Sequence, residues 1–151
     1  MDKPENRHQT DQTFFVTSVI EEREPIFRND EHAQRFIDAL QHFRKTEEIK
    51  LYGFVVMPDH VHFVCRVVNG MTISSLVRRI KTFTSRDQLF HWQKGYWTVV
   101  ISRKEMLIEK LNYMHANPIR AKLVEDLKDY KWSSWQEFYQ KPEPEMVDRV
   151  T

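Results

Sequence analysis

Cysteine is scarce in this sequence: Cys65 is the only one among 151 residues. A single thiol excludes an internal disulfide, and it excludes a zinc site built from several cysteines. The sequence also lacks a long hydrophobic run. The apolar run nearest the N-terminus, Phe14–Ile20, is far shorter than the roughly 20 residues of a membrane-spanning helix, and it lacks the flanks of a secretory signal. We therefore expect a cytoplasmic protein that does not associate with membranes.

Net charge is also small, at +1, so the overall charge does not indicate a nucleic-acid partner. The distribution of charge is more informative. Between residues 66 and 104 the only acidic residue is Asp87, whereas the basic residues are Arg66, Arg78, Arg79, Lys81, Arg86, Lys94, Arg103 and Lys104. A basic middle segment of this kind can form a local phosphate-binding surface on an otherwise neutral protein.

No internal repeat or low-complexity linker divides the chain, and its length suits one compact domain. Residues 1–12 are expected to form a flexible N-terminal tail and residues 141–151 a flexible C-terminal tail. The segment between them, 13–140, is predicted to be a single domain.

Apolar and β-branched stretches predict four strands, at residues 13–20, 49–57, 60–68 and 96–101. Apolar residues at helical spacing predict a helix at about 30–45, capped by Asn29 or Asp30, and another that Thr72 caps and that ends near residue 86. Met57-Pro58-Asp59 is a turn signal, so the second and third strands are expected to form a hairpin.

A further helix is expected at Ser102-Arg103-Lys104-Glu105, because this string matches a capping box. It should run to about Asn117, where Pro118 stops it, and Trp132-Ser133-Ser134-Trp135 should open a short last helix. The resulting order, β-α-β-β-α-β-α, is typical of an α+β, ferredoxin-like split βαβ fold. Its antiparallel four-stranded sheet would carry helices on one face, with the C-terminal helix added. This scaffold hosts many functions, so the fold alone decides none.

The first motif that could carry chemistry is His60-Val61-His62. Residues two apart on a strand point to the same face, so the two imidazoles project side by side and can hold one metal ion. Val61, Phe63 and Cys65 point to the opposite face, where the thiol cannot join them. Imidazole suits transition metals. The alternative is a pair of ordinary strand histidines, because this spacing is common.

The second motif is Tyr113-Met114-His115-Ala116-Asn117-Pro118. Tyr113 and Asn117 are four residues apart and share a helix face, so they could supply a nucleophile and a third metal ligand. The alternative is a core tyrosine beside an asparagine at a helix end. His115 lies on another face, where it is expected to be either an ordinary polar residue or one that complements the helix dipole near the helix end.

The third feature is the basic segment with interleaved aromatic residues. Aromatic faces can stack with unpaired bases while basic side chains contact phosphates. The aromatic candidates are Phe83, Phe90, His91, Trp92, Tyr96 and Trp97, and Arg78, Arg79, Lys81 and Arg86 fall largely outside the buried helix stripe. The alternative is a solvated helix face, with about half of the rings in the core.

Taken together, these strings resemble the single-tyrosine HUH transposases, and more closely their branch of REP-associated tyrosine transposases. The resemblance covers nearly all of residues 13–139. Tyr52–Phe63 resembles the family's signature strand pair, and Asn112–Val124 and Asp129–Ser134 resemble its helix end and the segment after it. Gln93–Trp97 matches the aromatic entry to the fourth strand, and Phe14–Thr17 and Pro25–Phe27 fit the N-terminal strand and loop.

The resemblance implies that Tyr113 is the catalytic nucleophile and that His60, His62 and Asn117 hold one Mg²⁺ or Mn²⁺ ion. It implies nicking and strand transfer of single-stranded or hairpin DNA through a 5′-phosphotyrosine, with repetitive extragenic palindromes (REP) as the target. The residues expected to contact DNA are Arg78, Arg79, Lys81, Arg86, Lys94 and Trp97. The protein would act as a monomer or a homodimer.

Three other functions fit parts of the pattern. A catalytically silent protein of the same fold could regulate palindromes by binding hairpin DNA without forming a covalent adduct. An RNA-recognition module has a similar element order, but the aromatic motifs it needs on its central strands are missing. A metalloenzyme with another substrate would leave the basic segment without a role.

Overall fold

The computed structural model describes residues 11–150. Four strands are observed: β1 (Thr13–Val19), β2 (Ile49–Val56), β3 (His60–Val67) and β4 (Trp97–Ile101). The helices are α1 (Asp30–Lys45), α2 (Ile73–Ser85), α3 (Lys104–His115), α4 (Asn117–Arg120) and α5 (Trp135–Tyr139), and short 3₁₀ turns lie at Glu21–Arg23, Ile26–Arg28 and Leu127–Asp129. No helix in this range is long and apolar enough to cross a membrane.

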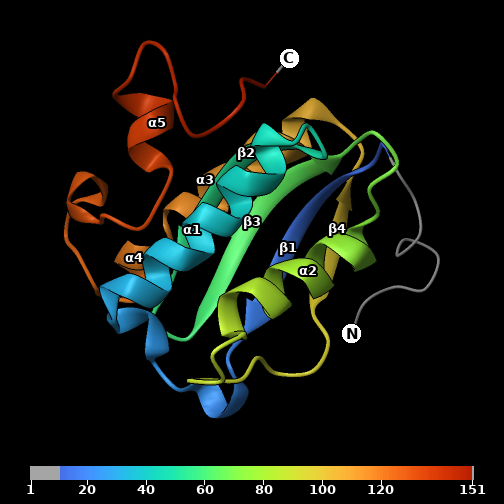
Figure 1. The fold of residues 1–151 in the computed structure, drawn as a ribbon. Helices are drawn as coiled ribbons and strands as arrows, with labels where there is room; N and C mark the ends of the chain where they lie inside the picture. The colour runs from blue at the N-terminus through green and yellow to red at the C-terminus, as the bar shows by residue number, and fades with distance from the viewer. Residues whose placement is uncertain (1–10, 151) are drawn as a thin grey trace.

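The strands form one antiparallel sheet in the order β2-β3-β1-β4. Helices α1 and α2 cover one face, and α3 packs on the other (Figure 1). The predicted ferredoxin-like split βαβ fold is therefore confirmed, with the C-terminal helix as the added element.

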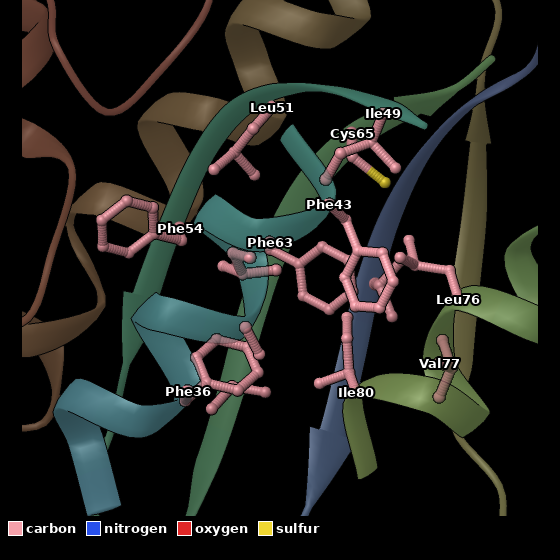
Figure 2. Close-up of a cluster of buried hydrophobic side chains, with 14 of the residues drawn as sticks. Phe36, Phe43, Ile49, Leu51, Phe54, Phe63, Cys65, Leu76, Val77 and Ile80 are labelled. Carbon is pink, nitrogen blue, oxygen red and sulfur yellow. The ribbon is translucent and has the colours of Figure 1, made fainter. Parts of the chain in front are cut away.

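Alternation along β3 separates the two faces of the sheet. Val61, Phe63 and Cys65 point toward α1 and α2, where they join Phe36 and Leu76 in the larger apolar cluster (Figure 2). The residues between them on β3 point toward α3, because side chains of a strand alternate between faces. This alternation places both histidines on the α3 face.

Helix α3 packs on the sheet through Leu107, Leu111 and Met114. Gly53 of β2 permits the close approach: a Cβ atom there would lie 2.7 Å from Cδ2 of Leu111 and 2.9 Å from Cε of Met114. Real carbon atoms do not approach so closely. The absence of a side chain at this position therefore sets how near α3 lies to the sheet.

Several predicted helix ends agree with the structure. The side chain of Asn29 accepts from the backbone N–H of Glu31 at the start of α1, and Thr72 accepts from the N–H of Ser75 at the start of α2. These side chains satisfy backbone donors that the first turn of a helix leaves unpaired. The expected short last helix is α5.

Helix α3 lies within two residues of its predicted bounds, but both signals predicted for its ends were wrong. The capping box does not form, because Arg103 still has extended backbone angles, so the helix begins at Lys104, beyond the reach of Ser102, and has no side-chain cap. Pro118 does not stop the helical path, since Ala116 is helical and Pro118 lies in the first turn of α4. Proline is tolerated there because the N–H it lacks would have no partner.

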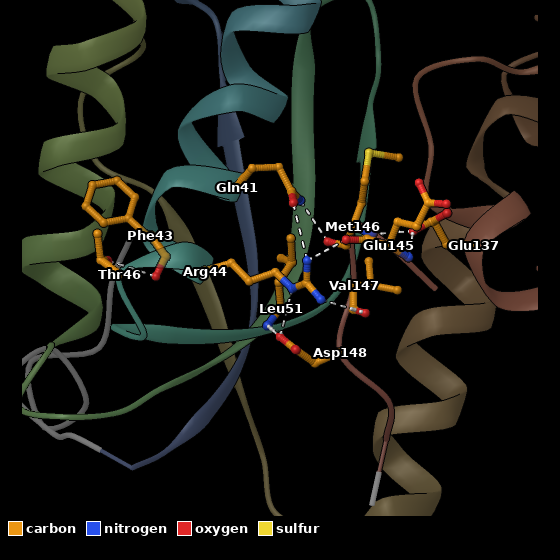
Figure 3. A network of polar contacts seen from close by, with 10 residues as sticks. All are labelled: Gln41, Phe43, Arg44, Thr46, Leu51, Glu137, Glu145, Met146, Val147 and Asp148. Atoms are coloured by element: carbon orange, nitrogen blue, oxygen red, sulfur yellow. Dashed lines mark hydrogen bonds and ion pairs between the residues drawn. The ribbon is translucent and has the colours of Figure 1, made fainter. Parts of the chain in front are cut away.

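The C-terminal segment differs from the predicted flexible tail. The Asp148 carboxylate accepts from the backbone N–H of Leu51 at 2.8 Å and from Nε of Arg44 at 3.3 Å. Arg44 also donates to the carbonyls of Glu145 and Val147 (Figure 3). Val147 is buried among the core residues. Residues 142–150 are held because they satisfy the edge of β2, which would otherwise expose unpaired backbone groups.

Residues 132–134 cover the rest of that edge, where Val56 donates to the carbonyl of Trp132 and Ser134 donates to the carbonyl of Phe54. The predicted N-terminal tail, 1–12, lies outside the described residues except for Asp11 and Gln12.

Candidate active site

His60 and His62 lie side by side on the α3 face of β3, as their spacing predicted. Their ring centroids are 4.8 Å apart and the rings are nearly perpendicular, at 79°. The exposed fraction of His62 is 8%, whereas His60 is partly exposed. The two imidazoles therefore form a pair that one ion could reach from the open side.

Each imidazole is oriented through its Nδ1 atom. Nδ1 of His60 donates to the Asp59 carboxylate at 2.6 Å, and Nδ1 of His62 is in hydrogen-bond contact with the Thr17 hydroxyl at 2.8 Å. Arg23 pairs with the same Asp59 carboxylate at 3.1 Å. A partner on Nδ1 fixes the ring and leaves Nε2 available, which is the usual arrangement of metal-binding histidines.

The charges around this pair favour metal binding. Burial lowers the pKa of His62 to about 3, with smaller contributions from His60 and Arg120, so the ring is neutral near pH 7. Although burial opposes ionisation of Asp59, hydrogen bonds from His60 and Arg23 hold its pKa below the usual value. A neutral imidazole such as that of His62 is a competent ligand, and the ionised Asp59 carboxylate orients the neighbouring ring of His60.

Tyr113 lies on the same face of the molecule as the histidine pair. Phe15 of β1 joins them: its ring stacks on His62 at 5.2 Å between centroids, and it meets the Tyr113 ring edge at 6.3 Å. The exposed fraction of Tyr113 is 53%, so its hydroxyl is accessible to a large substrate. The sheet and α3 therefore bring together two motifs that are 51 residues apart in sequence.

Arg120 is a residue of this site to which the sequence analysis gave no role. Its guanidinium lies 4.1 Å from the centroid of the Tyr113 ring, and Nη2 donates to the Tyr113 carbonyl at 2.7 Å. Its charge also contributes to the lowered pKa of His62. The signal was present, since the arginine follows Asn117-Pro118 shortly after the tyrosine, but only the α3–α4 junction places it over the ring.

Asn117, the third predicted ligand, is half-buried and opens α4 directly after Ala116. Because Ala116 has helical backbone angles, Tyr113 and Asn117 stay about one turn apart. Among residues 11–150 there is no group of three or more histidine, cysteine, aspartate or glutamate side chains that could hold a metal ion. Two imidazoles and one amide oxygen are a donor set that could hold a divalent ion such as Mn²⁺ or Mg²⁺, with positions left for other oxygen ligands.

His115 differs from its expected role at the helix end. It is buried, its Nε2 lies 2.7 Å from the Ser134 hydroxyl, and burial lowers its pKa to about 4. A neutral ring cannot complement the helix dipole. Ser134 also accepts from the N–H of Phe54, so this contact ties the end of α3 to β2.

The predicted DNA-binding residues of α2 lie across the sheet from the histidine pair. Arg79 pairs with Glu48 at 3.1 Å and covers the Phe43 ring, and Lys81 donates to the carbonyls of Gln93 and Gly95. Burial lowers the pKa of Lys81 to about 8. Both side chains therefore already have partners within the protein.

The other three basic candidates are more open. Arg78 is exposed and approaches the Ser75 hydroxyl at 3.4 Å, Arg86 lies over the Phe83 ring at 4.9 Å, and Lys94 is exposed.

Trp97 is the one predicted DNA-contacting residue that the structure places on the face of the histidine pair. It pairs with Thr17 across β1 and β4, and directly paired residues point to the same face. Its exposed fraction is 43%, which is large for a tryptophan. The indole therefore lies beside the threonine that orients His62.

A family model described as "Transposase IS200 like" matches residues 9–117. A protein of Haemophilus influenzae, described as a REP-associated tyrosine transposase, is 21% identical over 81% of this chain and 78% of its own length.

Two solved structures are similar in fold. A REP-associated tyrosine transposase bound to a REP hairpin is 18% identical and has a TM-score of 0.80, over 100% of this chain and 93% of that one. A protein of Deinococcus radiodurans assigned as a transposase is 19% identical and has a TM-score of 0.52, over 75% of this chain and 95% of that one.

Proposed function

Because the chain belongs to the IS200-like transposase family, we propose that it cleaves and rejoins single-stranded DNA, with Tyr113 as the nucleophile. One observation carries this proposal: Phe15 contacts both His62 and Tyr113, so an accessible phenol and a pair of oriented imidazoles share one face. A buried tyrosine, or one across the sheet from the histidines, would not support it.

The reaction is a phosphoryl transfer. The Tyr113 oxygen attacks the scissile phosphorus, its proton leaves, and the bond to the neighbouring 3′ oxygen breaks. The products are a 5′-phosphotyrosine and a free 3′-hydroxyl, and the reverse attack rejoins a strand. Positioning and neutralisation of charge supply most of the acceleration in such transfers.

The residues of this chain perform the positioning. His60, His62 and Asn117 would hold Mg²⁺ or Mn²⁺, which when bound supplies Lewis-acid activation and orientation of the phosphate. Asp59 and Thr17 hold the Nδ1 atoms of the two imidazoles, which would leave Nε2 of each ring available to the ion. Arg120 fixes the Tyr113 backbone and ring, and its charge can offset that of a phosphate bound there.

The relatives and the exposure of Tyr113 support the proposed substrate class. One solved structure of this fold holds a REP hairpin, so we propose hairpin DNA with a single-stranded flank. Trp97 is placed to stack on an unpaired base near His62. Arg78, Arg86 and Lys94 stay predicted phosphate contacts, and they would require DNA to extend to the α2 side.

The test is formation of a covalent adduct. The protein is incubated with Mn²⁺ and a 3′-labelled single-stranded palindrome with flanks, so that the label stays on the fragment joined to Tyr113, and the products are separated on a denaturing gel. A protein–DNA band that is absent with Tyr113→Phe and with His62→Ala supports the proposal. DNA binding with no covalent band over several palindromes would instead favour a silent hairpin-binding regulator.

A further inference from the structure

Two basic residues, Lys50 and Arg66, lie side by side at the end of the α3 face that is away from the histidine pair. Lys50 of β2 pairs directly with Arg66 of β3, Arg66 pairs with Thr13 of β1, and Thr13 pairs with Ile101 of β4. Directly paired residues point to the same face. Arg66 is therefore on the face of His62, four residues further along the same strand.

The pairing of Lys50 with Arg66 is unfavourable in the protein alone. Like charges directly opposite each other on a sheet repel, and both side chains are exposed. Within residues 11–150 neither forms an ion pair with a carboxylate. An anion bound between them would remove this repulsion, so the pair points to a negatively charged ligand.

Two cavities meet at Arg66. The first, of about 460 Å³, is also lined by Arg103, Lys104 and Tyr52, and its one carboxylate is Asp11. The second, of about 450 Å³, is lined by Lys50, Arg66 and Tyr52 together with residues of the C-terminal segment. There the carboxylate of Asp148 already pairs with Arg44, and that of Glu143 with Arg149.

Tyr52 reaches this place because the β2–β3 register shifts between Leu51 and Gly53. Leu51 pairs with Cys65 and Gly53 with Val64, so Tyr52 is the extra residue of a bulge and joins the α3-face cluster. A bulge re-aims a side chain. It brings a phenol beside the Arg66 guanidinium, which opposes the burial-driven rise in the Tyr52 pKa.

We propose that Lys50, Arg66, Arg103 and Lys104 form a second phosphate-binding site, which holds the backbone of the DNA strand that flanks the cleaved bond. This inference rests on the proposed function. Four strand residues span about 13 Å, the rise of about four nucleotides at the 3.4 Å spacing of one stacked strand. One strand could therefore pass from the Tyr113 site, along α3, to the basic end.

The experiment measures DNA affinity against salt. Wild type and Lys50→Gln/Arg66→Gln are titrated with a fluorescein-labelled single-stranded palindrome with flanks, by anisotropy, between roughly 50 and 400 mM NaCl. Losing two phosphate contacts should reduce the slope of log affinity against log salt by about 1.4, because each contact on a single strand contributes about 0.7. With equal affinity at about 1 M salt, that is about a 25-fold loss at about 0.1 M.

The matched control removes the same charge elsewhere. Arg28→Gln/Lys45→Gln changes two exposed cations outside the proposed site, and it should keep the wild-type slope. Thermal melting of Lys50→Gln/Arg66→Gln should not fall below that of wild type, since the like-charge contact is removed. A second variant, Arg103→Gln/Lys104→Gln, should weaken binding in the same way.

The adduct assay separates this inference from the proposed function. Both proposals are supported if wild type forms the adduct and the charge variants show a smaller slope of log affinity against log salt than wild type. A wild-type adduct with unchanged slope and affinity in both charge variants overturns the second site and leaves the function intact. If wild type neither forms an adduct nor binds the DNA, the proposed function fails and the second site with it.

Discussion

Gly53→Ala should shift α3 and lower the rate of DNA cleavage more than it lowers the stability of the fold. The added Cβ would lie 2.7 Å from Leu111, 2.9 Å from Met114 and 3.2 Å from the Ser134 hydroxyl. Carbon atoms in contact normally lie about 3.5–4.0 Å apart, so relief requires a movement of about 1 Å. Both atoms are the far ends of side chains, but Leu111 and Met114 are buried, so we expect α3 to move together with these side chains.

The magnitude can be estimated from two opposing effects. Overpacking a core lowers the free energy of unfolding by about 1–3 kcal/mol. Replacing a glycine that has an ordinary backbone conformation raises it by about 0.4–1 kcal/mol, because the unfolded chain then has less conformational entropy. The net loss is about 1–2 kcal/mol. For a chain of about 150 residues this lowers Tm by roughly 2–8 °C.

The effect on cleavage should be larger than the effect on folding. Tyr113 directly precedes Met114, so a shift of α3 displaces the nucleophile relative to His60 and His62. A misplacement of about 1 Å can cost about 100-fold in rate. We expect the rate of adduct formation to fall about 10- to 100-fold at room temperature, where the variant is still folded, while DNA affinity measured by anisotropy stays near that of wild type.

Gly70→Ala is the matched control. Gly70 has φ of +86°, and a Cβ added there would have no atom within 4 Å. Alanine at this position therefore strains the backbone by about 1–2 kcal/mol without touching α3. It should lower Tm by a similar amount and keep the wild-type cleavage rate. The reasoning is refuted if Gly53→Ala cleaves at the wild-type rate, or if Gly70→Ala loses as much activity.

Three further predictions concern other parts of the molecule. Thr17→Val removes the hydroxyl beside Nδ1 of His62 and should weaken Mn²⁺ binding about 10- to 100-fold; calorimetry that finds wild-type affinity would contradict this. Deletion of residues 142–151 removes the buried side chain of Val147, whose burial stabilises the fold by about 1.5–3 kcal/mol, and should lower Tm by about 3–12 °C. An unchanged Tm would instead support the prediction of a flexible C-terminal tail. Burial lowers the pKa of Lys81 to about 8 from the ordinary value of 10.5, so the unfolded chain binds more protons between these pH values. Wild type should therefore gain stability relative to Lys81→Met as pH rises from about 8 to about 10.5, by at most about 1.4 kcal/mol per pH unit, and denaturant unfolding that shows no such gain would argue against burial of the ammonium.

Local sequence rules predicted much of the fold because they act over a few residues. Asn29 and Thr72 cap helices where their side chains can reach free N–H groups, and Pro58-Asp59 turns the hairpin. The same rules failed at Ser102 and Pro118. There the extended backbone of Arg103 and the helical backbone of Ala116 decided the outcome, and neither can be read from a short string.

The histidine pair was predictable because the period of a strand is two, so His60 and His62 had to share a face. The role of the basic segment was not. Arg79 and Lys81 look available in sequence, yet Glu48 and two backbone carbonyls engage them in the folded chain. Whether a basic side chain is available to bind DNA depends on partners that are far away in the sequence, and a local sequence pattern does not identify those partners.

The sequence by itself determined the elements, the pairing of the histidines and, through resemblance, the family. Only the tertiary structure decided that Phe15 joins Tyr113 to His62 and that Lys50 lies opposite Arg66. The physical reason is that strand register and helix packing bring together residues far apart in the chain. Side-chain charge and hydrogen bonding then depend on those neighbours rather than on sequence order.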